Sequence, residues 1–353
     1  MVDDGLGPQG GDLRNLPPRA YIDLSTCVNR YGPPPAALAA FHAITPDDLR
    51  IHPYGVEAEL IKAYAAKFSV DPNDLIPGRG TTGFIRALSR AARHADVAIP
   101  FPAYTDFFRA FPGSGAFFAS GERVTPHIGQ VAAAMEIAKI VIIANPNNPC
   151  GTYFSPEALI EICDENPEHI LVVDESYIDF VAEDTARSLV GARPANLLVL
   201  QSPSKFYGIA GVRAGIAWTR GDRIKALLSE LRDPWPLSLP DVKVALAALG
   251  DSAWAEQTRE QLLDDGRWLD HLLRSHVEVE EAAMHYRFFF CNVADAIRAS
   301  LLEHGIIVRA LGAAHGVPYG GVRVAAPKMD EREKVAVALN TVLAKIPSCA
   351  TSL

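Results

Sequence analysis

The sequence has no long apolar run, no basic cluster and few cysteines, and each shortage excludes a class of protein. Its longest apolar stretches, such as Ile140 to Ala144, are far shorter than the roughly 20 residues that cross a bilayer. The N-terminus lacks the basic and apolar regions of a signal peptide. The five cysteines are scattered, with neither a zinc-site spacing nor a disulfide framework. We therefore expect a cytoplasmic protein with no membrane partner and no metal site.

Charge and length narrow the choice further. The net charge is −9 and no segment resembles a nucleic-acid footprint, so DNA or RNA is not expected as a partner. A hydrophobic share of 49% with mixed charges is typical of a globular chain. The 353 residues suggest about two domains.

Short apolar runs alternate with helical patterns through the middle of the chain. The predicted strands are Asp74–Pro77, Asp96–Pro100, Ala116–Ala119, Ile140–Ala144, Ile170–Asp174, Leu197–Gln201 and Ala214–Trp218. Helical spacing lies between them at Thr82–Arg93, at Pro156–Glu165 and in the stretch after Asp184. This alternation favours an α/β fold, with a mostly parallel seven-stranded sheet and helices on both faces. Such sheets bind ligands at the carboxyl ends of their strands.

The pattern changes after Trp218. A break at Asp233–Pro236 precedes a long predicted helical region from about Leu239 to His276, and short strands and helices follow. The predicted strands there are Phe288–Asn292, Ile306–Arg309 and Gly321–Ala325, and the predicted helices are Ala294–Glu303 and Asp330–Lys345. We predict a large domain over residues 46–235 and a smaller α+β domain over 236–353. Residues 1–45 would supply a loose N-terminal arm and part of the small domain.

The segment from Ser202 to Arg213 carries the clearest chemical signal, because Lys205 follows a predicted buried strand. A lysine is costly to bury, but its neutral amine forms a Schiff base with a carbonyl. Ser202, Ser204 and Arg213 offer two hydroxyls and a cation that suit a phosphate. A carbonyl plus a phosphate indicates pyridoxal 5′-phosphate (PLP). The alternative interpretation is an ordinary loop with a solvated lysine.

Two further strands end in polar residues. Asp174 follows the apolar run 170–173, and a carboxylate there would keep a pyridine nitrogen protonated, which makes the ring an electron sink. Asn148 and Tyr177 would then share the ring's phenolate oxygen. The alternatives are a turn built by the Asn and Pro residues around Asn148, and a helix N-cap at Asp174.

The first two strands add a phosphate signal and an aromatic ring. Gly80, Thr81 and Thr82 open a predicted helix, where free N–H groups and the helix dipole favour an anion. Tyr104 follows the second strand and suits stacking on a flat ring, although core packing is the commoner role of an aromatic residue.

These motifs resemble the fold type I PLP enzymes of the class I/II aminotransferase group over nearly the whole chain. The resemblance is carried by Asn145–Gly151, Asp174–Tyr177 and Ser204–Arg213. It implies Lys205 as the Schiff-base lysine, with Asp174 and Tyr177 beside it in catalysis. It also implies that Arg323 grips the substrate α-carboxylate. The implied cofactor-binding residues are Gly80, Thr81, Thr82, Tyr104, Asn148, Asp174, Tyr177, Ser202, Ser204, Lys205 and Arg213.

The chain is most similar to two branches, histidinol-phosphate aminotransferase and threonine-phosphate decarboxylase. Gly10–Arg14 and Ile22–Asn29 look more like the decarboxylase, and by this resemblance Asn29 would help to hold the substrate carboxylate. Three positions depart from the usual pattern: Arg30, Arg287, and His52, which stands where a tyrosine usually reaches the partner subunit's phosphate.

We therefore predict a PLP-dependent aminotransferase that converts amino acids to keto acids. Arg30, Arg287 and Arg309 hint at an anionic or phosphorylated side chain on the substrate, with Arg309 as a substrate contact. The alternatives are a decarboxylase of an O-phospho amino acid and, more distantly, a non-catalytic PLP-binding protein. The resemblance further implies a homodimer in which His52 reaches the neighbouring site.

Overall fold

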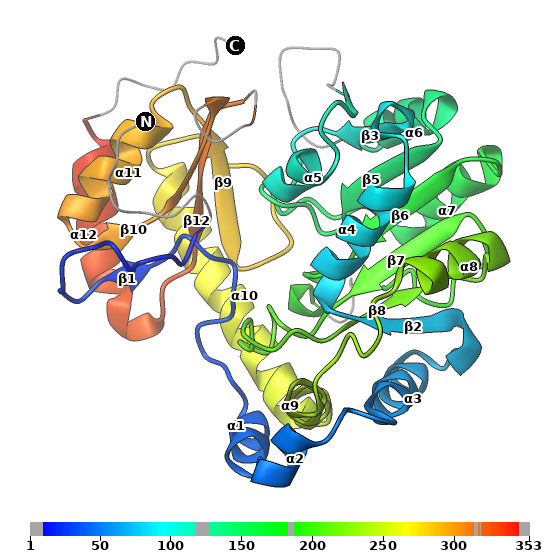
Figure 1. Cartoon of the computed structure of the whole chain (residues 1–353). Helices are drawn as coiled ribbons and strands as arrows, with labels where there is room; N and C mark the ends of the chain where they lie inside the picture. The colour runs from blue at the N-terminus through cyan, green and yellow to red at the C-terminus, as the bar shows by residue number, and fades with distance from the viewer. Residues whose placement is uncertain (1–9, 118–126, 183–186, 314–316, 318, 346–353) are drawn as a thin grey trace.

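The computed structural model of the chain describes residues 10–117, 127–182, 187–313, 317 and 319–345. Its largest element is a seven-stranded sheet with the order β2-β8-β7-β6-β5-β3-β4 (Figure 1). The strands are β2 (Leu75–Gly78), β3 (Val97–Pro100), β4 (Gly115–Phe117), β5 (Ile140–Ala144), β6 (Ile170–Asp174), β7 (Leu197–Gln201) and β8 (Gly215–Trp218). All seven predicted strands are therefore confirmed, although residues 118 and 119 of the third lie outside the described residues.

The sheet is mostly parallel, as predicted. Strands β3 to β7 pair in parallel, and only β8 runs antiparallel to its neighbours β7 and β2. The carboxyl ends of β5, β6 and β7 therefore meet at one edge, which brings together the segments that follow Ala144, Asp174 and Gln201.

Both faces of this sheet are buried, because alternate residues of each strand enter different cores. In β6, Leu171 and Val173 belong to one apolar cluster, whereas Val172 belongs to the other. Helices α6 (Ile128–Ile137) and α7 (Pro156–Glu165) contribute to the first core, and α4 (Gly80–Ala91), α5 (Thr105–Ala110) and α8 (Asp222–Leu231) contribute to the second. The near-continuous apolar strands are explained by this double covering.

One predicted helix is wrong. The stretch after Asp184, where it is described over residues 187–196, contains turns and no helix. The Leu189 backbone N–H donates to the buried Glu175 carboxylate at 2.8 Å. Gly191, with φ +96°, and Pro194 also interrupt helical geometry.

A smaller α+β part follows, in agreement with the prediction. Its antiparallel sheet has the order β11 (Arg309–Leu311), β12 (Gly321–Ala325), β9 (Tyr286–Phe290). A short parallel pair joins β1 (Ile22–Asp23) to β10 (Ile306–Ile307), so the N-terminal segment lies in this part. Helices α10 (Ser252–Arg274), α11 (Ala294–Glu303) and α12 (Arg332–Leu343) pack around one core with these strands.

The predicted helical region 239–276 is divided into two helices, α9 (Leu239–Leu249) and α10. Gly250 ends the first helix, and the Asp251 side chain caps the second by accepting from the Trp254 N–H at 3.2 Å. Helix α9 packs against α1 (Pro35–His42) and α3 (Val56–Phe68), at the bottom of Figure 1. The domain boundaries at residues 45 and 235 remain predictions.

Helix α2 (Pro46–Arg50) completes this lower region. It begins with a capping box, in which Thr45 and Asp48 satisfy each other's backbone N–H groups. None of the described helices is both long and apolar enough to span a bilayer.

Candidate active site

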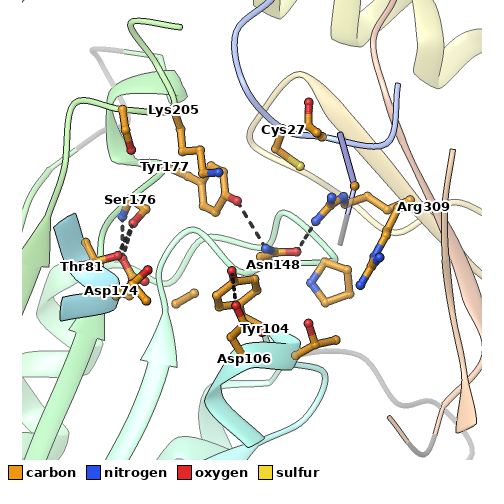
Figure 2. A pocket seen from close by; sticks show the side chains of 18 of the residues that line it. Cys27, Thr81, Tyr104, Asp106, Asn148, Asp174, Ser176, Tyr177, Lys205 and Arg309 are labelled. Carbon is orange, nitrogen blue, oxygen red and sulfur yellow. Dashed lines mark hydrogen bonds between the residues drawn. The ribbon is translucent and has the colours of Figure 1, made fainter. Parts of the chain in front are cut away.

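A pocket of about 370 Å³ lies at the edge of the large sheet where β5, β6 and β7 end. The segments after these strands form one side, together with the start of α4. Strands β11 and β12 of the small sheet supply the other side (Figure 2). Cys27 and Gly10 of the N-terminal segment also border it.

Lys205 reaches this pocket from the turn after β7. Its backbone is fixed because its carbonyl accepts from the Asn29 N–H at 2.9 Å. Its Nζ, by contrast, makes no hydrogen bond or ion pair with any residue in the described ranges. Burial lowers the pKa of the Lys205 ammonium below the ordinary lysine value. The side chain is therefore a partly buried amine with a lowered pKa, and it borders a cavity.

Asp174 lies at the end of β6, and its side chain is held from one side. Its Oδ1 accepts from the Ser176 backbone N–H at 3.0 Å and from the Ser176 hydroxyl at 2.5 Å. Asp174 is 5% exposed, and this burial raises the pKa of its carboxyl group. The hydrogen bonds from Ser176 and Thr81 and the charge of Lys205 oppose that rise.

Asn148 contacts Tyr177 on one side, as Figure 2 shows, and Arg323 on the other, so the three residues form a chain of contacts. Asn148 Nδ2 donates to the Tyr177 hydroxyl at 3.3 Å, and Asn148 Oδ1 accepts from Arg323 Nη1 at 2.5 Å. Arg323 Nη2 donates to the Ser25 carbonyl at 2.7 Å. The predicted pairing of Asn148 and Tyr177 is thus a direct contact, and Arg323 from β12 is tied to it.

An anion cradle lies at the start of α4. Thr81, Thr82, Ser202, Ser204 and Arg213 all border the pocket, as expected for phosphate ligands. Gly80 has φ +64°, and a Cβ added there would lie 3.0 Å from Arg213 Nη2. A side chain at that position would fill the space between the helix N-terminus and the guanidinium, so glycine keeps the cradle open. Hydroxyls, a guanidinium and a helix N-terminus at one end, with a partly buried lysine and a buried carboxylate beyond, fit PLP.

Tyr104 borders the pocket from the segment that precedes α5. Its hydroxyl donates to Asp106 Oδ2 at 2.9 Å, and Arg109 Nη1 donates to the other oxygen of Asp106 at 3.0 Å. Burial raises the Tyr104 pKa, so the phenol stays protonated and the ring has a fixed donor contact. Its position fits the predicted stacking role.

Arg309 and Arg323 are cross-strand partners in β11 and β12, so both side chains lie on the same face of the small sheet. Arg309 is 7% exposed and borders the pocket, but it has no hydrogen bond or ion pair within the part of the chain that the structure describes. Burial, together with Arg323, lowers the Arg309 pKa to about 10, and the group therefore keeps its charge at neutral pH.

Four predicted or suspected residues lie outside the pocket. Asn29 is buried, but its amide donates to the Phe206 carbonyl at 2.7 Å and its Oδ1 accepts from the Tyr31 N–H, so it serves the backbone around Lys205. Arg30 pairs with Glu331 through a 2.6 Å hydrogen bond. Arg287 pairs with Asp270 at 2.7 Å. His52 is exposed and stacks on Trp235 at 4.5 Å between ring centroids.

The placements of Arg30 and Arg287 remove two of the three cations that had suggested an anionic substrate. Both guanidinium groups are neutralised by carboxylates of the small part of the protein, and neither borders the pocket. Of the three arginines, Arg309 alone borders the pocket.

Sequence reasoning gave no role to several pocket residues, among them Cys27, Asp106 and Ser176. Ser176 has a detectable signal, because a hydroxyl two residues after an aspartate commonly bonds to it locally. Cys27 and Asp106 have no such signal. Burial raises the Cys27 pKa, so this residue presents a neutral thiol.

Comparison with known proteins gives a consistent result. Residues 19–340 match the family described as aminotransferase class I and II. Histidinol-phosphate aminotransferase 1 of Pseudomonas aeruginosa is 31% identical over 297 residues, which cover 82% of this chain and 84% of that protein.

Two solved structures share the fold. The histidinol-phosphate aminotransferase of Sinorhizobium meliloti, in complex with pyridoxal 5′-phosphate, has a TM-score of 0.78 at 21% identity, covering 92% of this chain and 91% of that one. The L-threonine-O-3-phosphate decarboxylase of Porphyromonas gingivalis has a TM-score of 0.76 at 20% identity, covering 91% and 99%.

Proposed function

This chain belongs to the aminotransferase class I and II family and is a PLP-dependent aminotransferase, and on that premise we propose that its substrate is an amine with an anionic, phosphate-like group. Histidinol phosphate, the substrate named for its relatives, is the first candidate. We further propose that the pocket described above is the active site.

Each role follows from the position of a side chain. Bound PLP supplies a carbonyl for the substrate amine and a pyridinium ring that accepts electrons. Lys205 would hold the cofactor through its carbonyl group, and its free amine would move the proton at the substrate Cα. Asp174 would hold the ring nitrogen, and Tyr177 with Asn148 would hold the ring oxygen. Thr81, Thr82, Ser202, Ser204 and Arg213 would bind the phosphate, in the space that Gly80 leaves open.

One observation carries the substrate proposal: two buried arginines border the same pocket, and only one of them has acceptors among the described residues. Arg323 donates to Asn148 and to the Ser25 carbonyl, whereas Arg309 has no acceptor among the described residues. An unpaired buried cation is costly, so the geometry favours an anionic substrate group between them. A guanidinium pair suits a phosphate or carboxylate.

The test is a substrate screen with the reconstituted enzyme. Histidinol phosphate, O-phospho amino acids and their dephosphorylated counterparts are each incubated with the enzyme, and the carbonyl product and the aminated cofactor are quantified. We expect product only from substrates that carry the anionic group. Equal turnover of phosphorylated and dephosphorylated amines would contradict the proposal. Lys205→Ala should abolish turnover, whereas the exposed control Lys139→Ala, whose partner is Asp96, should not.

Decarboxylation of an O-phospho amino acid is the second candidate, and the N-terminal segment favours it. Gly10, from the decarboxylase-like stretch Gly10–Arg14, borders the pocket, and Gly11 N–H donates to Ser25 Oγ at 3.1 Å. This segment therefore lies where it would contact a substrate. Release of carbon dioxide without any carbonyl product would replace the aminotransferase proposal with this one.

We also propose a cytoplasmic homodimer. Exposed apolar side chains gather on α1, α2 and the nearby loops, at Leu38, Phe41, Leu49, Ile51, Tyr54 and Trp235. His52 stacks on Trp235 within this group. Such a surface suits burial against a second copy, with His52 directed toward the neighbour's phosphate cradle.

Subunit complementation tests this arrangement. Lys205→Ala and His52→Ala should each reduce activity, but a mixed dimer has one site with both residues intact if His52 acts across the interface. We expect mixing of the two inactive or weakened proteins to restore activity. A monomer in sedimentation experiments that keeps full activity would contradict the dimer.

A further inference from the structure

Ser176 holds the carboxylate of Asp174 through the shortest hydrogen bond of that group. Its hydroxyl donates to Asp174 Oδ1 at 2.5 Å, and its backbone N–H donates to the same oxygen at 3.0 Å (Figure 2). Because both bonds end on Oδ1, neither occupies Oδ2. Ser176 thus holds the carboxylate through one oxygen, at a position where Asp174 borders the pocket.

A second contact connects Ser176 to the anion cradle at the start of α4. Its Oγ lies 3.2 Å from Thr81 Oγ1, in the first turn of α4. Thr81 also borders the pocket and is 8% exposed. The series Thr81, Ser176, Asp174 therefore joins the helix N-terminus, where an anion is favoured, to the carboxylate at the end of β6.

Burial makes this donor important. Asp174 is 5% exposed, and desolvation opposes its ionised form, whereas a hydroxyl that donates to it stabilises that form. A charge-assisted hydrogen bond of this kind is shorter and stronger than a neutral one. An ionised Asp174 favours the protonated form of a basic nitrogen placed beside it.

We propose that Ser176 is a positioning residue that keeps Asp174 ionised and oriented, so that the cofactor's ring nitrogen stays protonated. This inference rests on the proposed function, in which Asp174 faces that nitrogen. Ser176 itself does not touch the reacting atoms.

The experiment places ¹⁵N-labelled PLP in the wild-type enzyme and in Ser176→Ala, Ser176→Thr and Asp174→Asn, and records the ring-nitrogen chemical shift. We expect Ser176→Ala to move the shift toward that of an unprotonated pyridine, in the direction of Asp174→Asn. Its kcat should fall about tenfold, the effect of one hydrogen bond to a charged group, with a smaller change in KM. Ser176→Thr keeps the hydroxyl and should restore both values.

Controls separate this role from a merely structural one. Ser89→Ala removes a hydroxyl that donates to the Ala110 carbonyl at 2.6 Å outside the pocket, and it should leave the ring-nitrogen shift unchanged. Thermal melting of each apoprotein checks that it is folded. A wild-type ring-nitrogen shift and kcat in a folded Ser176→Ala enzyme would overturn the role of Ser176 alone. If wild-type protein did not bind PLP through Lys205, the proposed function itself would fail.

Discussion

The two faces of the small sheet carry buried arginines in opposite situations. Arg309 and Arg323 are paired across β11 and β12 and face the pocket. Arg287 is paired with Val324 across β9 and β12, so it lies on the other face, toward α10. There it binds Asp270 at 2.7 Å and the Met284 carbonyl at 2.6 Å.

The presence or absence of a neutralising carboxylate separates an arginine with a structural role from one that is available to bind a ligand. Arg287 and Arg309 are almost equally buried, at 6% and 7% exposure, so burial alone does not separate them. The carboxylate of α10 neutralises Arg287, whereas Arg309 lacks an acceptor among the described residues. An arginine that folding leaves unneutralised beside a cavity is the one expected to bind an anion from solution.

Among substitutions of these arginines, Arg323→Met should lower kcat/KM the most. It removes the guanidinium that donates to Asn148 and to the Ser25 carbonyl, and with it one of the two cations proposed to flank the anionic substrate group. We expect kcat/KM to fall about 10³-fold, as is common when one partner of a buried charged contact is removed. Steady-state kinetics measures the loss, and Arg323→Lys should recover only part of it, because lysine lacks the bidentate fork. An Arg323→Met enzyme with wild-type kinetics would remove this residue from the site.

Arg287→Met should affect stability and not substrate binding. The substitution leaves Asp270 without its more buried partner, although Arg274 remains paired with it at 2.7 Å. We expect the free energy of unfolding to fall by about 2 kcal/mol, measured by urea denaturation. The KM for the anionic substrate should stay within about twofold, because Arg287 does not border the pocket. A large KM increase with unchanged stability would reverse the assignment of the two faces.

The smallest expected effect is on stability: Lys205→Met should change the free energy of unfolding of the cofactor-free protein only slightly. The partly buried ammonium has a lowered pKa in the folded state, so its cost to stability is complete below that pKa. Between that pKa and the ordinary lysine value, the folded state binds fewer protons than the unfolded state and becomes more stable as the pH rises. This cost disappears as the pH rises to the ordinary lysine value. Lys205→Met should therefore raise the stability of apoprotein by about 1 kcal/mol near neutral pH, and the gain should shrink at higher pH. Melting curves across the pH range test the sign, and a gain that grew with pH would contradict it.

The side of the pocket formed by the large sheet was largely predictable from the sequence. Asp174 ends β6 and Lys205 lies in the turn after β7. Both strands are recognisable by their apolar runs, and parallel pairing places their ends together. The seven strands were found because both faces of the sheet are buried and the runs are nearly continuous. Local sequence therefore specified both the strands and the positions of these side chains.

The substrate side was less predictable, because it depends on pairings between distant segments. Asn29 was expected near the substrate, but its amide binds the Phe206 carbonyl, 177 positions away. Arg30 and Arg287 were expected to signal substrate charge, and only the folded chain places Glu331 and Asp270 beside them. Helices α1 to α3 were not predicted, and the long region 239–276 was not divided, because the break at Gly250-Asp251 is only two residues long.

The most direct test of the account is the discrimination ratio of Arg309→Met. The kcat/KM for a phosphorylated amine and for its dephosphorylated counterpart is measured in the wild type, in Arg309→Met and in the matched variant Arg287→Met. We predict that Arg309→Met lowers the preference for the phosphorylated amine by about 100-fold, the scale of a lost charge-assisted contact, while Arg287→Met keeps it. An Arg309→Met enzyme that retained the wild-type preference would contradict the assignment of this face to an anionic substrate.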